Sequence, residues 1–448
     1  MQDKIKGSLF GYFVGDALGV PHEFKSRSSI NNGVTDMDEF GTHNQPRGTW
    51  SDDSSMVLAT LTSLIDKKEI DYNDIMSNYV KWYKRGVFTP FNEVFDIGNG
   101  TRMSLDKYDG SNYKCGLDDI YSNGNGSLMR VLPISIYLHF TNDQLFDVVK
   151  NYSSMTHAHI YSVFSCIIYT VYINEYLKSS DKINAYISMQ NIIKSVLENE
   201  QYKEFLGDTE DLKNKFNRII YNDISKYGVD EIKSSGYVID TLEAAFWCLL
   251  TTDNYKDSVL KAVNLGDDTD TVGAITGSLS GLVYSYESIP ENWINNLQRL
   301  SYLKDLTDRY IGLINELITK STIKDWTNNT ESNIEEEIAT KDSFKSIPFT
   351  SYDKVKVDIT LNKDEFELLK KGHIAREMED HWNMYTDDNS INYLRSWTGI
   401  QIFKALYKFE NDSYLIYELD INNNKEEYNE EDINQSVELF KKMLRRNL

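Results

Sequence analysis

Apolar residues recur at three- and four-residue spacing from residue 5 to about residue 286, a spacing typical of helices with buried faces. The clearest predicted helices cover residues 56–65, 161–177 and 272–284. The last of these is rich in Ala, Gly and Ser, which would let a neighbouring helix approach closely. Strand-like alternation is scarce in this part of the chain. We therefore predict a mostly α fold, with a compact all-helical domain over residues 1–325.

The pattern changes near the C-terminus. Residues 355–361 and 413–419 alternate between apolar and polar side chains with a period of two, which predicts strands. We interpret residues 346–448 as a small α+β domain of unknown role. The polar and acidic stretch 326–345 is interpreted as a linker or a solvated helix. A chain of 448 residues is long enough for two or three domains.

Two aromatic patches in the C-terminal segment have competing interpretations. Residues 381–385 and 395–399 combine Trp, Tyr and Arg, which are common at recognition surfaces. We favour the simpler interpretation that these aromatics fill the core of a small domain. Substrate selection, dimerisation and a second nucleotide site stay open as roles for the segment.

The formal net charge of −22 argues against general binding to nucleic acids, because an acidic surface repels phosphate. The three cysteines are widely spaced and form no CxxC motif, which argues against a thiolate zinc site and fits a reducing compartment. No stretch reaches about 18 apolar residues, and glycines and an aspartate interrupt the apolar run at the N-terminus. We therefore expect a cytoplasmic protein without a membrane span.

Three acidic segments flanked by glycine lie far apart, at residues 15–24, 48–54 and 265–273. In the last two, residues 51–54 and 267–271 place carboxylates and hydroxyls directly before an apolar helix. A helix cap needs only one such residue, so these segments supply more than capping requires. Two carboxylates about 4 Å apart repel by roughly 4 kcal/mol at an effective dielectric near 20. A cluster drawn from both segments would therefore need cations, and its oxygen ligands favour Mg²⁺ or Mn²⁺ over zinc.

In their order along the chain, these segments resemble the ADP-ribosylglycohydrolases, a family related to dinitrogenase-reductase-activating glycohydrolase. The resemblance runs across about residues 3–320 and combines five short motifs, each of them weak alone. The motifs are Gly15-Asp16-Ala17-Leu18-Gly19 with Glu23, Trp50-Ser51-Asp52-Asp53, Asn125-Gly126 with Met129-Arg130, Thr156-His157, and Gly266 with Asp268-Thr269-Asp270-Thr271. The family's Thr-Asp-Asp-Thr is Ser-Asp-Asp-Ser here, and both replacements keep an oxygen donor.

The resemblance implies a site that holds two Mg²⁺ or Mn²⁺ ions. The expected ligands are Ser51, Asp52, Asp53, Asp268, Asp270 and Thr271. The expected catalytic residues are Glu23, Asp52 and Asp53. The residues expected to line the ADP-ribose cleft are Asn125, Gly126, Ser127 and His157. Supporting roles are expected for Asp16 and Asp267 near the ligands, and for Met129 and Arg130 in packing and local ion pairing. Tyr12 and Phe24 are either an aromatic face for the ligand or ordinary core aromatics.

The implied activity is hydrolysis of the N- or O-glycosidic bond between ADP-ribose and a protein side chain or nucleobase, which reverses ADP-ribosylation and releases ADP-ribose. Arginine is the linkage most often assumed for the family, while serine and nucleobase linkages stay open. We expect loops such as residues 86–122 to make that choice. Paired carboxylates with metal ions can supply the activated water and the proton for the leaving group. The alternatives are a non-catalytic ADP-ribose-binding protein, a toxin-neutralising immunity protein on the same fold, and a phosphohydrolase that uses the same metals.

Overall fold

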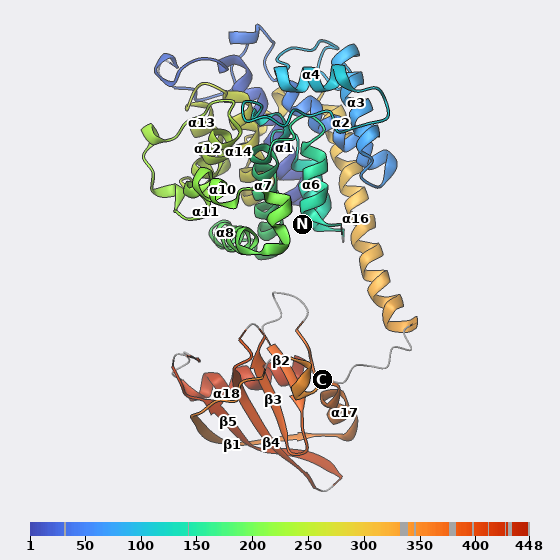
Figure 1. The fold of residues 1–448 in the computed structure, drawn as a ribbon, viewed down its shortest axis with the longest axis vertical. Coiled ribbons are helices and arrows are strands. Elements are labelled where there is room, and N and C mark those ends of the chain that lie inside the picture. Colours follow the sequence, from blue (N-terminus) through green and yellow to red (C-terminus); the bar gives the residue numbers. More distant parts are fainter. Residues whose placement is uncertain are drawn as a thin grey trace. The chain divides into compact units, whose positions relative to one another are not determined.

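The computed structural model divides into two compact units, Met1–Asp325 and Trp326–Leu448, which are described separately (Figure 1). The described residues are 1–30, 33–141, 143–331, 339–344, 346–375, 382–396, 398–410, 412–425, 427–428 and 432–446, with the backbone alone at 320–331, 342, 364 and 446. Among the described residues, no helix combines the length and the apolar character needed to cross a bilayer.

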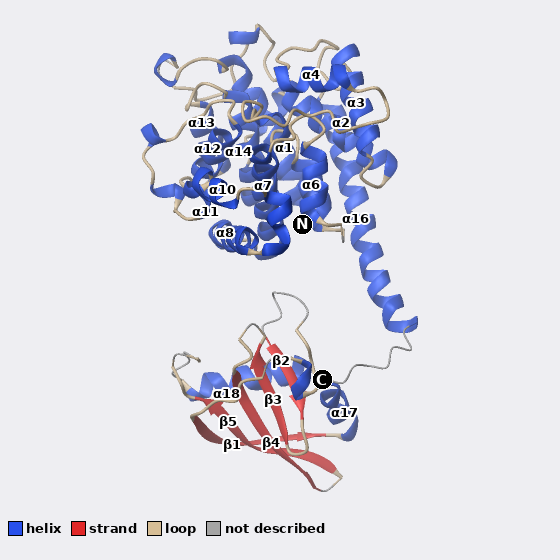
Figure 2. Cartoon of the chain, viewed as in Figure 1, coloured by secondary structure: helices blue, strands red, loops and turns tan. Residues whose placement is uncertain are grey.

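Helices make up the regular structure of the first unit over its described residues, which confirms the predicted mostly α fold (Figure 2). The α-helices are α1 (Gln2–Gly19), α2 (Asp52–Lys67), α3 (Tyr72–Arg85), α4 (Asn99–Lys107), α5 (Leu132–His139), α6 (Leu145–Ser153), α7 (Ile160–Ser179), α8 (Lys182–Glu198), α9 (Lys203–Leu206), α10 (Thr209–Lys215), α11 (Asn217–Ile220), α12 (Val238–Leu250), α13 (Tyr255–Val263), α14 (Thr269–Tyr284), α15 (Glu291–Asn296) and α16 (Leu300–Glu331). The predicted helices at 56–65, 161–177 and 272–284 lie within α2, α7 and α14. Residues 326–331, the start of the predicted linker, continue helix α16.

Helices α1, α7 and α14 are buried on nearly all sides and form the centre of the first unit (Figure 1). Their side chains are apolar or small around the whole circumference, as is typical of helices enclosed by other helices. The other helices pack around them, so the hydrophobic core runs continuously through this unit.

Glycines bring the backbones of α1 and α14 into direct contact. A Cβ atom at Gly7 would lie 2.3 Å from the carbonyl oxygen of Gly281. Equivalent atoms at Gly11 and Gly15 would lie 2.2 and 2.1 Å from the carbonyl oxygens of residues 277 and 273, which are also glycines. Because no side chain fits at this seam, the two helices approach more closely than ordinary residues allow. The seam holds the C-terminal end of α1 beside the N-terminal end of α14, where the first and third acidic segments lie.

The second unit is an antiparallel five-stranded sheet with two helices, as expected for a small α+β domain. Its strands are β1 (Tyr352–Leu361), β2 (Trp382–Thr386), β3 (Ser390–Arg395), β4 (Gln401–Glu410) and β5 (Ser413–Asn422), in the spatial order β1-β5-β4-β3-β2. Its helices are α17 (Lys363–Lys371) and α18 (Ile433–Arg446). Strands β1 and β5 contain the two segments predicted from alternation, and they pair with each other.

Aromatic side chains fill the core of the second unit. Phe440 of α18 packs against Tyr393 and Phe403, with ring centroids 5.9 Å apart in each case. Trp382, from the first aromatic patch of the sequence, packs on Phe403 at 5.9 Å and lies under the guanidinium of Arg395 at 4.3 Å. These contacts support the core interpretation of the patches; residues 381 and 397 lie outside the described part of the chain.

We expect Gly15→Ala to destabilise the first unit, because its new methyl group would collide with backbone that cannot move aside. The expected loss in unfolding free energy is about 2 kcal/mol or more, the range of overpacked cores. Urea unfolding followed by circular dichroism at the helix band measures it. Gly312→Ala in α16 is the matched control, since nothing lies within 4 Å of a Cβ atom there. Equal stability of Gly15→Ala and wild type would contradict the close packing.

Candidate active site

A cleft of about 540 Å³ opens in the first unit where the acidic segments meet. The expected site residues that line it are Glu23, Asp52, Asn125, Gly126, His157, Asp268 and Thr271. Part of its wall comes from residues drawn from 96–103 and 117–122. The 86–122 region, which we expect to choose the linkage, therefore contributes to the cleft.

Carboxylates from all three acidic segments converge at the floor of this cleft. Oxygens of Asp16, Asp53 and Asp270 lie within 4.8 Å of one another, and so do oxygens of Glu23, Asp268 and Asp270. These groups come from α1 and the turn after it, from α2, and from the start of α14. Asp270 belongs to both sets, so the two clusters are contiguous.

Two oxygens of this cluster have no hydrogen-bond donor among the described residues. They are Oδ2 of Asp53 and Oδ2 of Asp270, and both are buried. Leaving a buried anionic oxygen without a partner is costly, and native structures rarely do so without a bound ion or water. The donor set is oxygen only, which is the set that hard divalent cations prefer. The residues present therefore fit a cation site.

Burial and mutual repulsion favour the protonated forms of the clustered carboxyl groups. Desolvation is the largest cause that raises the pKa of Asp53 and of Asp270, followed by the charge of Asp16 on the former and of Glu23 on the latter. Desolvation also raises the pKa of Asp52, with Asp96 as the next cause. A divalent cation would reverse this balance by favouring the charged forms.

Asp16 organises the beginning of α2. Its carboxylate accepts hydrogen bonds from the backbone N–H of Ser51 at 2.9 Å and from the backbone N–H and hydroxyl of Ser54 at 3.0 and 2.6 Å. Burial raises the pKa of Asp16 to about 6, although these hydrogen bonds oppose the shift. Asp16 thus fixes the first turn of α2, which carries Asp52 and Asp53, in agreement with a supporting role.

The expected ligands Ser51 and Thr271 lie at helix starts beside the cluster. Ser51 is the N-cap of α2, and its hydroxyl accepts a hydrogen bond from the backbone N–H of Asp53 at 3.2 Å. The hydroxyl of Thr271 donates to Oδ1 of Asp53 at 3.5 Å, and its backbone N–H donates to Asp270 at 2.9 Å. Asp267 is exposed and contacts the turn after α1 through its backbone only, at Phe24 and Lys25.

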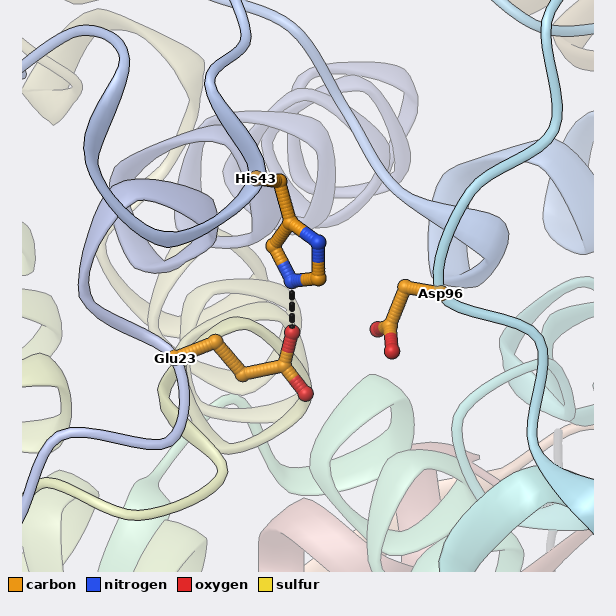
Figure 3. Close-up of side chains that lie close together, drawn as sticks. All are labelled: Glu23, His43 and Asp96. Atoms are coloured by element: carbon orange, nitrogen blue, oxygen red, sulfur yellow. Dashed lines mark hydrogen bonds and ion pairs between the residues drawn. The ribbon is translucent and has the colours of Figure 1, made fainter.

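Glu23 lies at one side of the cluster together with two residues that the sequence did not single out, His43 and Asp96 (Figure 3). Nε2 of His43 shares a hydrogen bond with Oε2 of Glu23, and the carboxylate of Asp96 points toward this pair. Desolvation, then the charge of Asp96, raises the pKa of Glu23 to about 11, and desolvation lowers the pKa of His43. Both shifts favour the uncharged forms of the two groups in the metal-free protein.

Asn125, Gly126 and His157 form the other side of the cleft. The side-chain amide of Asn125 donates to Oδ2 of Asp268 at 2.8 Å. His157 lies directly behind Gly126, where a Cβ atom would come within 2.6 Å of the imidazole ring. Burial lowers the pKa of His157 to about 3, and its Nδ1 pairs with the hydroxyl of Thr156 at 2.7 Å. The imidazole is therefore neutral at physiological pH.

Two expectations for this region, on Ser127 and Arg130, need correction, and the open alternatives for Tyr12 and Phe24 can be compared with the structure. Ser127 does not line the cleft: it is fully buried behind it, and its hydroxyl accepts from Ser153 at 2.9 Å. Arg130 makes no ion pair with any described carboxylate; its guanidinium lies between Tyr79 and Tyr152 at 5.3 and 5.1 Å. Tyr12 is a core residue, whereas Phe24 lines the cleft and is 69% exposed.

Without metal, Asp53→Asn should stabilise the protein, because it removes charge repulsion at a buried site. A carboxyl group whose folded pKa is raised binds its proton more tightly when folded, so stability falls as pH rises above about 4. We expect a thermal midpoint at least ~2 °C above that of wild type at pH 7.5 in EDTA, and a smaller difference at pH 5. Excess Mg²⁺ should raise the midpoint of wild type more than that of the variant. Glu69→Gln, at an exposed carboxylate, is the control. A lower midpoint for Asp53→Asn in EDTA would contradict the repulsion.

Comparison with known proteins matches the first unit. A family model described as ADP-ribosylglycohydrolase covers residues 1–321. The ADP-ribosylarginine hydrolase Tri1 of Serratia proteamaculans (strain 568) is 34% identical over 68% of this chain and 78% of its own length. The ADP-ribosyl-dinitrogen-reductase glycohydrolase of Rhodospirillum rubrum is 25% identical over 66% of this chain and 91% of its own.

A solved structure titled ADP-ribosylglycohydrolase-related protein complex superposes with a TM-score of 0.57 at 27% identity, covering 70% of this chain and 98% of that one. The second unit lies beyond the family match, which ends at residue 321. The family model, the relative that is 34% identical and the similar solved structure all match the first unit. Together they show that this chain belongs to the ADP-ribosylglycohydrolase family of enzymes.

Proposed function

We propose that this chain is a dimetal hydrolase that releases ADP-ribose from arginine side chains of modified proteins. Membership of the family supports the reversal of ADP-ribosylation. The observation that supports the metal dependence is a pair of buried oxygens beneath the cleft, on Asp53 and Asp270, which have no hydrogen-bond partner among the described residues. Two clusters that share Asp270 offer room for a pair of divalent cations.

The groups that would hold the cations are oxygen donors from two helix starts: Ser51, Asp52, Asp53, Asp268, Asp270 and Thr271. Mg²⁺ and Mn²⁺ suit this donor set, whereas zinc usually takes His or Cys ligands. When bound, such cations supply Lewis acidity toward the ribose hydroxyls and lower the pKa of a bound water. Asp16 belongs to the first of the two clusters, and it also fixes the position of α2 through its hydrogen bonds to Ser51 and Ser54.

Different side chains of the protein would then act as proton acceptor and proton donor in hydrolysis. Asp52 lines the cleft and Asp53 lies buried beneath it, where a carboxylate can accept a proton from the attacking water. Glu23 lies beside them and is hydrogen-bonded to His43, and in its protonated form it can donate a proton to the departing side chain. Glycosidases likewise use a pair of carboxyl groups to cleave a glycosidic bond.

Asn125, Gly126 and His157 are proposed to hold the ADP-ribose moiety. Gly126 lines the cleft without a side chain that could block it, and the neutral His157 can donate one ring N–H to a phosphate or ribose oxygen. Phe24 offers an exposed aromatic face at the same cleft.

Asp96 supports the choice of arginine as the leaving group. Its half-buried carboxylate lines the cleft within 4.8 Å of Glu23 and His43. A carboxylate can bind a guanidinium through two parallel hydrogen bonds, and it has no matching partner on a serine linkage. The names of the Tri1 relatives, ADP-ribosylarginine hydrolases, agree with this choice.

Replacing both Asp268 and Asp270 by Asn should lower Mg²⁺-dependent release of ADP-ribose from arginine-linked substrate at least about 100-fold, because the cation ligands lose their charge. Release is measured by chromatography, in parallel with serine- and thymidine-linked substrates. Asp267→Asn is the matched control, since this neighbouring carboxylate is exposed and lies outside the clusters. Full activity of the double variant, or of wild type in excess EDTA, would eliminate the dimetal mechanism. Binding of ADP-ribose without any turnover by wild type would instead favour the non-catalytic alternative.

Asp96→Asn should weaken recognition of arginine selectively. We expect KM for an arginine-linked substrate to rise about 10- to 100-fold, the usual worth of a hydrogen bond between charged groups. Any remaining serine-linked activity should change much less. Glu93→Gln, an exposed carboxylate on the same loop, is the control in the same steady-state assay. An equal change for both linkages would show that Asp96 does not select the leaving group.

A further inference from the structure

The side chain of Glu23 is held by a turn that lies about twenty residues further along the chain. That turn is the short helix η3 (Gly41–His43), and the imidazole of His43 is hydrogen-bonded to the Glu23 carboxyl group (Figure 3). We propose that His43 is a positioning residue, which keeps the carboxyl group of Glu23 at the reactive side of the cleft. The inference rests on the proposed function, because it assumes that Glu23 takes part in hydrolysis.

The backbone of Glu23 is fixed from both sides. The hydroxyl of Thr42 donates to the carbonyl oxygen of Glu23 at 2.7 Å. The backbone N–H of Phe24 donates to the carbonyl oxygen of Asp267 at 2.7 Å, and Phe24 adopts a left-handed conformation with φ of 63°. The backbone position from which the Glu23 side chain extends is therefore fixed by η3 and by the acidic loop before α14.

The turn itself is seated on the segment that carries Glu23. Gly41 has φ of +55°, and a Cβ atom there would lie 2.0 Å from the carbonyl oxygen of Pro21. The turn is closed by a hydrogen bond from the backbone N–H of Phe40 to the carbonyl oxygen of Gln45 at 2.6 Å. Only glycine fits at residue 41, so the position of η3 relative to Glu23 is built into the backbone.

The imidazole ring of His43 is confined as well. Its centroid lies 5.8 Å from the ring of Phe24 and 5.1 Å from that of Phe95, the residue before Asp96. The side chain of His43 is 13% exposed and that of Glu23 is 5% exposed. A ring held by two aromatic neighbours can restrain a flexible glutamate better than a solvent contact can.

Restraint matters because a Glu side chain has three rotatable bonds and the cleft beside Glu23 is open. The carboxyl groups of Asp96, Asp268 and Asp270 lie close to that of Glu23. Without a fixed partner, the Glu23 carboxyl group could adopt rotamers that turn it toward solvent. The bond to His43 opposes that rotation, and a displacement of about 1 Å can cost about 100-fold in rate.

A double-mutant cycle on hydrolysis tests the proposal, using His43→Ala, Glu23→Gln and the pair. His43→Ala should lower kcat about 10- to 100-fold while KM changes less than about threefold, because positioning for chemistry is lost and binding is kept. The same change in the Glu23→Gln background should have no further effect, since His43 acts only through Glu23. His43→Gln, which keeps a hydrogen-bond donor, should recover part of kcat. Additive losses in the cycle would overturn the proposal.

The matched control is His22→Asn. His22 precedes Glu23 directly, is also buried, and faces a carboxylate, but its partner is Asp38 at 3.0 Å and it does not line the cleft. We expect kcat of this variant to stay within about threefold of wild type, the scatter of neutral substitutions. An equal loss of kcat in His22→Asn and His43→Ala would show a general effect of folding and would overturn the proposal.

A second readout does not depend on catalysis. The chain has seven histidines, so ¹⁵N-histidine labelling gives few ring signals, and loss of one in His43→Gln assigns residue 43. In metal-free protein at one pH, Glu23→Gln should shift the His43 ring-nitrogen signals and leave the other histidines unchanged. An unchanged His43 signal overturns the proposal. If Glu23→Gln shifts the His43 signals but the wild-type protein hydrolyses no ADP-ribosyl substrate, the proposed function fails while the contact between His43 and Glu23 stands.

Discussion

Direct backbone contact between α1 and α14 is the constraint on which the site depends. The glycines at residues 7, 11 and 15 face those at 281, 277 and 273, so the helices meet without intervening side chains. This contact brings residues that are some 250 positions apart in the chain into one cluster, as the hydrogen bond from Thr269 to the carbonyl of Gly19 also shows. Asp16 then ties α2 to the same place.

The cluster works against the stability of the metal-free fold. Buried carboxyl groups with raised pKa values, and oxygens on Asp53 and Asp270 that lack donors, are features that a structural core avoids. The surrounding unit holds them in place by glycine packing, helix caps and a continuous hydrophobic core. Strained electrostatics at a site that is otherwise rigid are typical of catalytic centres.

Sequence patterns predicted the helical unit, the terminal strands and most of the acidic cluster, because helix periodicity and repeated Asp residues before apolar helices are local signals. His43 and Asp96 could not be predicted this way, since one lies in the three-residue helix η3 and the other in an irregular segment. Neither segment has a periodic pattern, and both residues meet Glu23 only in the folded chain. Ser127 was misplaced because its neighbour Gly126 lines the cleft while the next side chain points into the core. Positive φ angles, such as that of Phe24, leave no reliable trace in sequence.

The cleft joins two kinds of backbone, and this division has an evolutionary consequence. The carboxylates of Asp16 and Asp270 stand on the two helices that meet at the glycine seam, whereas part of the wall comes from the first turn of α4 and from the irregular residues 96–98 and 117–122. Substitutions in those wall segments can therefore change which substituent fits the cleft, while the cluster of carboxyl groups beneath it stays intact. A change of target therefore need not alter the carboxyl groups that are proposed to carry out hydrolysis.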